Sequence, residues 1–237
     1  MSDVNPVFVA ERERILEEYA RRAKEVPGEQ YAPWDPATQL MLAERKRIAA
    51  LMLRRAGVFP GAGDRCLEIG CGALGWMGDL VSWRVAEEQL HGIDLDASRV
   101  AALRDTLPFA AIEVGDASEL PWPANQFRLA IASTVFTSIL APPMRRKVAQ
   151  EITRVLQPGG ALLWYDFAWN NPRNPNVRAV KRKELASLFP ELRGEIRSVT
   201  LAPPLARVIA PRSWTLATLM AAIPALRSHL LAVLVKP

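Results

Sequence analysis

The sequence has few of the residues that would define a disulfide-rich or zinc-binding protein. Of its 237 residues only two are cysteine, Cys66 and Cys71, and only two are histidine. Two cysteines five positions apart fit no zinc knuckle and form no disulfide framework. We therefore expect reduced thiols and no metal site, which is typical of a cytoplasmic protein.

Long apolar runs are also missing. No uncharged stretch of about 18 apolar residues occurs, so no membrane-spanning helix is expected. The first residues lack the basic start and the apolar core of a signal peptide, so none is expected. Half of the chain is nevertheless hydrophobic. This composition excludes collagen-like, coiled-coil and wholly disordered proteins and is enough for the core of one large domain, or of a domain plus a lid.

Acidic residues are scarce in the last third of the chain. The net charge is +5, from 30 basic and 25 acidic residues. Residues 171–237 hold 11 of the basic and three of the acidic residues, a charge of +8, which leaves 19 basic and 22 acidic residues, or −3, for residues 1–170. No nucleic-acid module is visible and aromatics are not interleaved with the basic run, so nucleic acid is not an expected partner. Four of these basic residues follow one another on one predicted helix: Arg178, Lys181, Arg182 and Lys183. The basic excess instead favours an anionic amphiphile, a phosphate-bearing substrate or a membrane surface as the binding partner.

Strands and helices are predicted to alternate, which is typical of an α/β protein with a parallel sheet covered by helices on both faces. Two helices come first, at 8–25 and 37–56, and the last third departs from the alternation with two further strands, which suggests a hairpin-like pair added to the sheet. The predicted strands are 65–69, 89–94, 111–114, 128–132, 161–165, 194–202 and 229–235. The other predicted helices are 75–85, 98–107, 142–156, 176–189 and 212–222, and residues 157–160 are predicted as a turn.

Three loops that follow successive predicted strands contain residues suited to a nucleoside-like ligand. The first runs from Gly70 to Gly75 and satisfies G-x-G-x-x-G, the second contains Asp94, and the third contains Asp116. Glycines let the backbone approach a ligand closely, and an acid at the end of the second strand can accept both hydroxyls of a ribose. These features suit NAD and S-adenosylmethionine alike. A carboxylate at Glu68 favours a ligand with an ammonium group over a pyrophosphate.

Taken together, these motifs resemble the class I S-adenosylmethionine-dependent methyltransferases, in particular the small-molecule members with the methyltransferase type 11 pattern. The matching segments lie within residues 60–166: 67–75, 92–96, 115–123, 127–131 and 151–160. The resemblance implies a Rossmann-like seven-stranded sheet of order 3-2-1-4-5-7-6 with strand 7 antiparallel. It also implies residues 1–57 as an N-terminal helical lid, residues 58–237 as the core, and about 167–228 as the substrate-selecting part.

The resemblance further implies S-adenosyl-L-methionine as cofactor, S-adenosyl-L-homocysteine as product, and a set of binding residues. Glu68, Gly70 and Gly72 would surround the methionine part, Asp94 would hold the ribose, and Asp116 with Ala117 the adenine. Ser133 and Thr134 would border both cofactor and substrate. Tyr31, with Trp34, either closes over the cofactor or fastens the second helix to the core. The full set of cofactor-binding candidates is Glu68, Gly70, Cys71, Gly72, Asp94, Leu95, Asp116, Ala117, Ser133, Thr134 and Tyr31.

The catalytic candidates are Tyr165 and Asp166, at the end of the fifth predicted strand. Either could orient or deprotonate an acceptor hydroxyl; alternatively, Tyr165 packs and Asp166 caps a turn. His91 is expected to be structural, and His229 to be packed or at the surface. The segment Ser133-Thr-Val-Phe replaces the Asn/Asp-Pro-Pro-Tyr motif typical of DNA base methylation, which disfavours that reaction.

The preferred interpretation is methyl transfer by direct displacement to a small-molecule acceptor: a secondary metabolite, a sugar or a lipid-like compound, with an anionic acceptor among the options. The alternatives are an RNA or protein methyltransferase, a non-catalytic cofactor- or partner-binding module, and a nicotinamide-dependent dehydrogenase. The basic and apolar C-terminal part also suggests weak association with a membrane surface, and thus a cytoplasmic protein peripheral to the inner membrane face.

Overall fold

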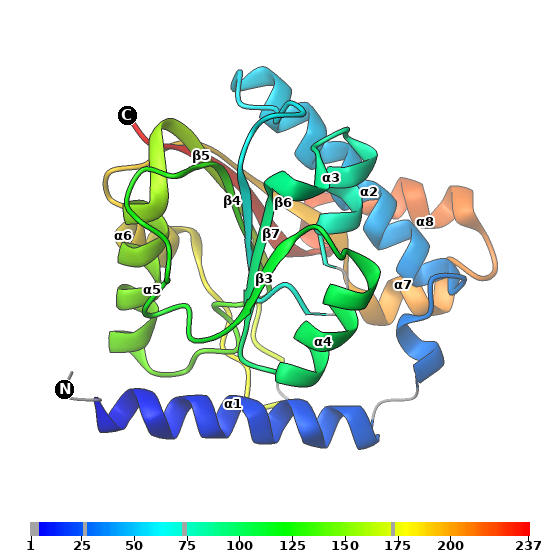
Figure 1. Ribbon diagram of the computed structural model, residues 1–237. Helices are drawn as coiled ribbons and strands as arrows, with labels where there is room; N and C mark the ends of the chain where they lie inside the picture. The colour runs from blue at the N-terminus through cyan, green and yellow to red at the C-terminus, as the bar shows by residue number, and fades with distance from the viewer. Residues whose placement is uncertain (1–4, 26–27, 73–74, 172–173) are drawn as a thin grey trace.

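A seven-stranded sheet forms the centre of the protein (Figure 1). The computed structural model describes residues 5–25, 28–72, 75–171 and 174–237. The strand order is β3-β2-β1-β4-β5-β7-β6, so the predicted fold class is confirmed. The strands are β1 (Cys66–Ile69), β2 (Leu90–Asp94), β3 (Ala111–Val114), β4 (Phe127–Ser133), β5 (Leu156–Phe167), β6 (Arg193–Leu201) and β7 (Arg227–Val235).

The first five strands are parallel, and β7 runs antiparallel to both of its neighbours. The carboxyl ends of β1 to β5 therefore meet at one edge of the sheet, where open α/β sheets bind their ligands. The antiparallel direction of β7 brings its first residues to the same edge, where His229 pairs with Phe167. The end of the chain thus contributes to the ligand-binding edge.

Helices cover both faces of the sheet (Figure 1). On one face α5 (Pro142–Val155) and α6 (Arg182–Leu188) pack against β4 and β5 in one apolar core. On the other face α2 (Pro36–Arg55), α3 (Met77–Ser82) and α4 (Ala97–Thr106) pack in a second core. Next to β6, α7 (Pro203–Ile209) and α8 (Trp214–Ala221) pack against α2. Short 3₁₀ helices span Gly28–Tyr31, Glu87–Gln89 and Pro224–Leu226.

The first helix, α1 (Pro6–Glu25), does not lie on a face of the sheet. It runs across the carboxyl edge, along the bottom of Figure 1. Its inward side is apolar enough to enter the core, since Ile15 is only 3% exposed. The site described below is therefore enclosed on one side by α1.

The predicted elements occur in the predicted order, with three differences in the second half. The turn predicted at 157–160 lies inside β5, where Gly159 adopts a φ of +74° while the strand continues. The helix predicted at 176–189 is restricted to α6, and α7 was not predicted. None of the helices in the described ranges is both long and apolar enough to cross a membrane.

Candidate functional site

The loop after β1 brings bare backbone to the carboxyl edge. Gly70 has a φ of +65°, and its N–H donates to the carbonyl of Ile93 (2.8 Å). A Cβ added at Gly70 would lie 2.8 Å from Cγ2 of Val135, so the position requires glycine. Ala73 and Leu74, the middle of the predicted glycine motif, lie outside the described residues.

Asp94 connects the first two loops of this edge. Its Oδ2 accepts the N–H of Gly72 (2.8 Å) and its Oδ1 accepts the N–H of Asp96 (2.9 Å). The side chain is buried at 5% exposure but lines the cavities at the edge. These two amides fix the direction in which the carboxylate presents its remaining lone pairs.

Two adjoining cavities lie at the carboxyl edge. The larger cavity, which we name the cleft, has a volume of about 530 Å³, within the range of small-molecule sites. The smaller, of about 50 Å³, lies under α1. Gly70, Asp94 and Tyr19 line both, so the two cavities belong to one site divided by side chains of α1 and the loops.

Eight of the eleven cofactor-binding candidates line this site. Leu95, Asp116 and Ala117 line the small cavity; Ser133, Thr134 and Tyr31 line the cleft; and Gly70 and Asp94 line both. The structure therefore brings together residues from four loops that are far apart in sequence. Their roles toward a cofactor stay predictions.

Glu68, Cys71 and Gly72 line neither cavity. The carboxylate of Glu68 is buried and accepts the N–H groups of Trp76 (2.8 and 2.9 Å) and Met77 (3.0 Å) at the start of α3. Burial raises the pKa of Glu68 to about 8. Cys71 is fully buried, and burial raises the pKa of its thiol. In this structure Glu68 thus holds the glycine loop against α3 and presents no oxygen to a ligand, contrary to the expectation for a cofactor ammonium group.

The two catalytic candidates point in different directions, because neighbouring strand residues face opposite sides of a sheet. Asp166 is fully buried: its Oδ1 accepts the hydroxyl of Thr137 (2.5 Å) and the N–H of Phe167 (3.0 Å), and its Oδ2 accepts the N–H of Thr137 (3.1 Å). Burial raises the pKa of Asp166 to about 6. Since Asp166 does not line the cleft, it holds the loop after β4 in place and has no access to an acceptor from that position.

Tyr165 does line the cleft, as part of an aromatic floor. Its ring stacks on His229 (4.7 Å between centroids, 6° between planes), and His229 also contacts the ring of Phe167 at 4.1 Å. The Tyr165 hydroxyl is hydrogen-bonded to Oγ1 of Thr200 (3.0 Å), and burial raises its pKa to about 12. Burial lowers the pKa of His229 to about 3. Both groups are neutral at physiological pH, and His229 is packed, one of the two placements expected.

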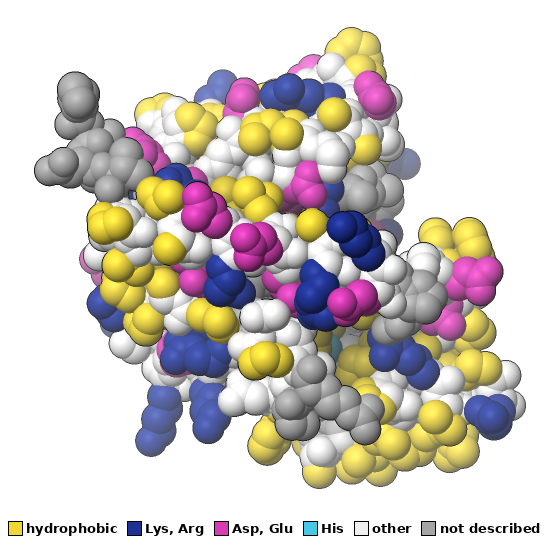
Figure 2. Space-filling view, turned by 90° about the horizontal axis from the view of Figure 1, so that it is seen from below, with side chains coloured by type: hydrophobic (Ala, Val, Ile, Leu, Met, Phe, Trp, Pro, Cys, Tyr) yellow, Lys and Arg dark blue, Asp and Glu magenta, His cyan; other side chains and the backbone are white. Residues whose placement is uncertain are grey.

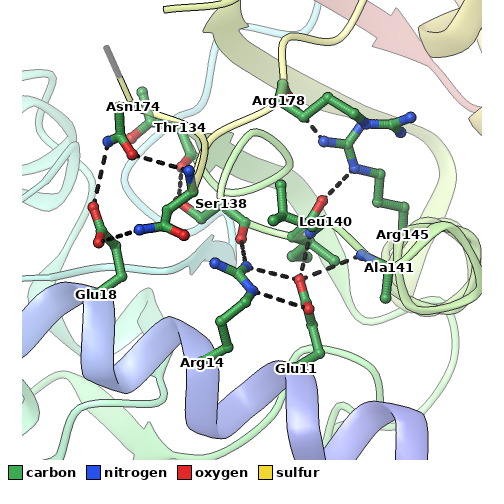
Figure 3. A network of polar contacts seen from close by, with 12 residues as sticks. Glu11, Arg14, Glu18, Thr134, Ser138, Leu140, Ala141, Arg145, Asn174 and Arg178 are labelled. Carbon is green, nitrogen blue, oxygen red and sulfur yellow. Dashed lines mark hydrogen bonds and ion pairs between the residues drawn. The ribbon is translucent and has the colours of Figure 1, made fainter. Parts of the chain in front are cut away.

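A polar network fastens α1 over the site (Figure 3). The carboxylate of Glu11 accepts the N–H groups of Leu140 and Ala141, and Arg14 donates to the carbonyl of Ser138 (2.5 Å). Burial opposes ionisation of Glu11, but Arg14 and the two amides outweigh it, so its pKa lies below the usual range. These contacts join the first helix to the loop after β4.

The same helix also reaches the third ligand-type loop. Arg12 forms an ion pair with Asp116 (3.2 Å), whose other oxygen accepts the N–H of Ser118 (2.7 Å). The carboxylate predicted to receive an adenine amine is therefore paired with α1 in this structure.

Four arginines line the cleft, and sequence reasoning did not single them out. They are Arg22 on α1, Arg45 on α2, Arg99 on α4 and Arg207 on α7, whereas Asp94 is the one acidic residue among the described lining residues. The basic residues that the sequence did single out, at 178–183, do not line the cleft; Arg178 pairs with Glu184 (2.6 Å). No signal in the sequence of the second helix distinguishes Arg45 from its basic neighbours.

Residues 66–160, from β1 into β5, match a family model described as a methyltransferase domain. Over this segment the chain is similar to the class I S-adenosylmethionine-dependent methyltransferases. This similarity confirms the resemblance carried by the motifs at the carboxyl edge. The match includes the loops with Gly70, Asp94 and Asp116 but not α1, α2 or the elements after β5.

Curated relatives of the methyltransferase domain act on varied compounds. The chain is 32% identical over 143 residues to 27-O-demethylrifamycin SV methyltransferase of Amycolatopsis mediterranei, covering 56% of this chain and 49% of that protein. It is 33% identical over 133 residues to trans-aconitate 2-methyltransferase of Methylobacterium nodulans, covering 55% and 48%. The chain spans about half the length of the curated relatives it matches.

Solved structures share the fold at low sequence identity. Geranyl diphosphate C-methyltransferase from Streptomyces coelicolor A3(2) matches with a TM-score of 0.60 and 16% identity, covering 81% of this chain and 78% of that one. The [4+2]-cyclase SpnF matches with a TM-score of 0.58 and 20% identity, covering 81% of each chain. The fold alone therefore does not decide the reaction.

Proposed function

We propose that this chain transfers a methyl group from S-adenosyl-L-methionine to a small-molecule acceptor. The observation that carries the proposal is the joint placement of Gly70 and Asp94 beside a cleft of about 530 Å³, within a domain of the methyltransferase family. The relatives named above, which methylate small molecules by name, support the same class of acceptor.

The residues at the edge fit such a cofactor. Gly70 offers backbone without a side chain, and Asp94 offers a fixed carboxylate to a pair of ribose hydroxyls. Asp116 suits an exocyclic amine once Arg12 releases it. When bound, the cofactor supplies a methyl group on a positively charged sulfur, which is already an activated leaving group.

The chain's own contribution is to bind, orient and exclude water. Ser133 and Thr134, at the end of β4 and in the loop after it, line the cleft together with Gly70, Asp94 and the aromatic floor. Holding an acceptor in line with the methyl group is worth a large part of the barrier in such reactions. Tyr165 orients the acceptor as a neutral phenol, since its pKa of about 12 keeps it protonated.

We further propose that α1 serves as a lid, as the helical segment 1–57 was predicted to do. Support comes from its position across the carboxyl edge and from the contacts of Glu11, Arg12 and Arg14 to the loops beneath it. Exchange of the cofactor would then require these contacts to open.

Thermal unfolding tests the proposal against a nicotinamide enzyme and a domain that binds no cofactor. S-adenosyl-L-homocysteine should raise the Tm of the full chain, because a ligand that binds only the folded state stabilises it. NAD(H) at the same concentration should leave the Tm unchanged. Stabilisation by NAD(H) alone, or by neither compound, would end the proposal. Release of S-adenosyl-L-homocysteine in the presence of acceptors then separates an enzyme from a binding module.

Association with a membrane surface remains a second proposal about the same chain. Five apolar side chains of the α7–α8 region are exposed: Val208, Trp214, Leu216, Leu219 and Ile223. An amphipathic surface of this kind binds anionic lipid more weakly as salt rises. Flotation with vesicles of phosphatidylglycerol and phosphatidylcholine tests it: absence of binding at low salt would remove the proposal, and with it the predicted location at the inner membrane face.

A further inference from the structure

The cleft carries positive charge that the protein itself does not neutralise. Figure 2 looks onto the carboxyl edge from below and shows basic side chains around a hollow beside α1. Of the four arginines that line the cleft, Arg99 has partners of its own: Asp96 at 3.5 Å and the ring of Tyr19 at 4.4 Å. Arg22, Arg45 and Arg207 form no ion pair with any residue in the described ranges.

Two of these guanidinium groups are partly buried without a hydrogen-bond acceptor. Nε of Arg45 and Nε of Arg207 are both shielded from solvent, and neither has a partner among the residues that the structure describes. Arg145 is different: it is only 1% exposed and donates to the carbonyls of Ile139 (2.5 Å) and Arg178 (2.8 Å) and to Glu184 (2.7 Å). Arg14 and Arg178 also have one buried nitrogen each without a partner, but both are ion-paired, to Glu11 and Glu184, whereas Arg45 and Arg207 are not. Because an unmet buried donor costs stability, the contrast points to an acceptor supplied from outside.

Aromatic rings form cation–π contacts with both of these groups. The guanidinium carbon of Arg45 lies 4.2 Å from the centroid of the Trp76 ring and 5.4 Å from that of Tyr165. The guanidinium of Arg207 lies 5.6 Å from the ring of Tyr31. A contact of this kind uses none of the N–H donors of a guanidinium as a hydrogen bond, so these donors stay available to an oxyanion. Arginine binds carboxylate and phosphate oxygens through two such N–H groups at once.

Glu68 interacts electrostatically with Arg45 but does not pair with it. The oxygens of Glu68 accept the amides of Trp76 and Met77 and form no ion pair with Arg45. Burial also raises the pKa of Glu68 to about 8, so much of it is uncharged near neutral pH. The charge of Arg45 is therefore left for a ligand in the cleft.

We propose that the methyl acceptor carries an oxyanion, a carboxylate or a phosphate, which Arg45 and Arg207 bind in the cleft, with Arg22 at its margin. The proposal rests on the proposed function, since it names the acceptor class of the same site. It also moves the anion-binding role from the basic run at 178–183 to arginines on α1, α2 and α7. Gly70 and Asp94 line the same cleft, so an acceptor held there lies beside the cofactor loops.

Calorimetry with two simple oxyanions tests this without an identified acceptor. Tricarballylate, a tricarboxylate, and inorganic pyrophosphate are titrated into the full chain, with and without saturating S-adenosyl-L-homocysteine. We expect at least one to bind, and Arg45→Gln/Arg207→Gln to weaken it at least about 10-fold while leaving the affinity for S-adenosyl-L-homocysteine within about twofold. Binding of only one of the two oxyanions decides between carboxylate and phosphate.

The control is Arg146→Gln, which removes the same charge from an exposed position on α5 outside the cleft. Failure of both oxyanions to bind the wild-type chain, or equal affinities in the cleft and control variants, would overturn the proposal. If the double variant does not fold, Arg207→Gln alone on α7 should still weaken binding about threefold or more, and no change there would overturn it. A wild-type chain that binds the oxyanion but not S-adenosyl-L-homocysteine would refute the proposed function alone.

Discussion

The loops after β1, β2 and β3 present carboxylates and bare backbone to the ligand-binding edge, whereas α2 and α7 present guanidinium groups above an aromatic floor. In the first region the polar groups are already fixed by the fold, as the two amides on Asp94 show. In the second, Arg45 and Arg207 have donors without partners. Under the two proposals above, the first region binds a constant ligand, the cofactor, and the second is completed by the acceptor.

The largest effect is expected at Asp94, in the region of the loops after β1, β2 and β3. Asp94→Ala removes the acceptor for the Gly72 and Asp96 amides together with the proposed ribose ligand. Hydrogen bonds to a charged group are worth about 1.5–3 kcal/mol each, so affinity for S-adenosyl-L-homocysteine should fall at least about 100-fold in calorimetry. Asp105→Ala, an exposed acid on α4, is the matched control. Unchanged affinity in Asp94→Ala would contradict the ribose assignment.

The second prediction concerns acid stability and His229, on the floor of the cleft. Lowering the pH should reduce the free energy of unfolding through this residue. Its folded pKa of about 3 lies below the usual 6.5, so the unfolded chain takes up a proton first as pH falls. This contribution to stability is present above pH 6.5 and is lost as pH falls toward 3. Between pH 7 and 4.5 the loss amounts to about 2–3 kcal/mol.

In His229→Gln this part of the pH dependence should be absent. Urea unfolding at pH 7 and 4.5 measures it as the difference in free energy of unfolding between the two proteins at each pH. His91→Gln is the comparison variant: burial lowers the pKa of His91 as well, but His91 is only half-buried, so its removal should change the pH dependence less than that of His229. The same pH slope in wild type and His229→Gln would show that His229 is not held neutral by burial.

A smaller effect is expected at the glycine loop. Gly70→Ala places a Cβ at positive φ and 2.8 Å from Cγ2 of Val135, which should lower the free energy of unfolding by about 1–2 kcal/mol. Adding Val135→Ala should relieve the contact and recover part of the loss. Gly63→Ala, where a Cβ meets nothing within 4 Å, should leave stability nearly unchanged. An equal decrease in the free energy of unfolding for Gly70→Ala and Gly63→Ala would show that Gly70 is not closely packed against Val135.

The smallest effect is expected at the ion pair that joins α1 to the loop after β3. Arg12→Ala releases Asp116 from α1, and a partly exposed pair is worth up to about 1 kcal/mol. We therefore expect affinity for S-adenosyl-L-homocysteine to rise by about two- to fivefold, measured by calorimetry. A loss of affinity would mean that Arg12 itself contacts the cofactor. Lys24→Ala removes an exposed cation of the same helix that lines neither cavity, and it should leave the affinity unchanged.

The contrast between the two regions also explains what the sequence could predict. The cofactor loops depend on short local motifs, so Gly70, Asp94 and Asp116 could be placed at the carboxyl edge from spacing and strand order alone. Asp96, directly before α4, accepts the N–H groups of Ser98 and Arg99 and so begins that helix through an equally local contact. Contacts of this kind join residues close in sequence, so they can be predicted without knowing the tertiary structure.

The acceptor region depends on contacts between distant segments, which a sequence does not display. Arg45 faces the cleft because α2 packs over Trp76 and Tyr165, more than 30 and 100 positions away in the chain. The glycines at 159 and 160 suggested a turn, but β5 continues through them because Gly160 lies against the backbone of Phe127 and Arg128. Asp166 was expected at the cleft, yet the alternation of β5 turns it toward Thr137.

The most direct test is a crystal structure of the full chain with S-adenosyl-L-homocysteine and with tricarballylate or pyrophosphate, whichever binds the chain more tightly. The account predicts the ribose hydroxyls within hydrogen-bond distance of Asp94 and the oxyanion on Arg45 and Arg207, on the side of the cofactor sulfur that faces the cleft. A cofactor that leaves Asp94 without a contact, or an oxyanion bound away from the two arginines, would contradict the account.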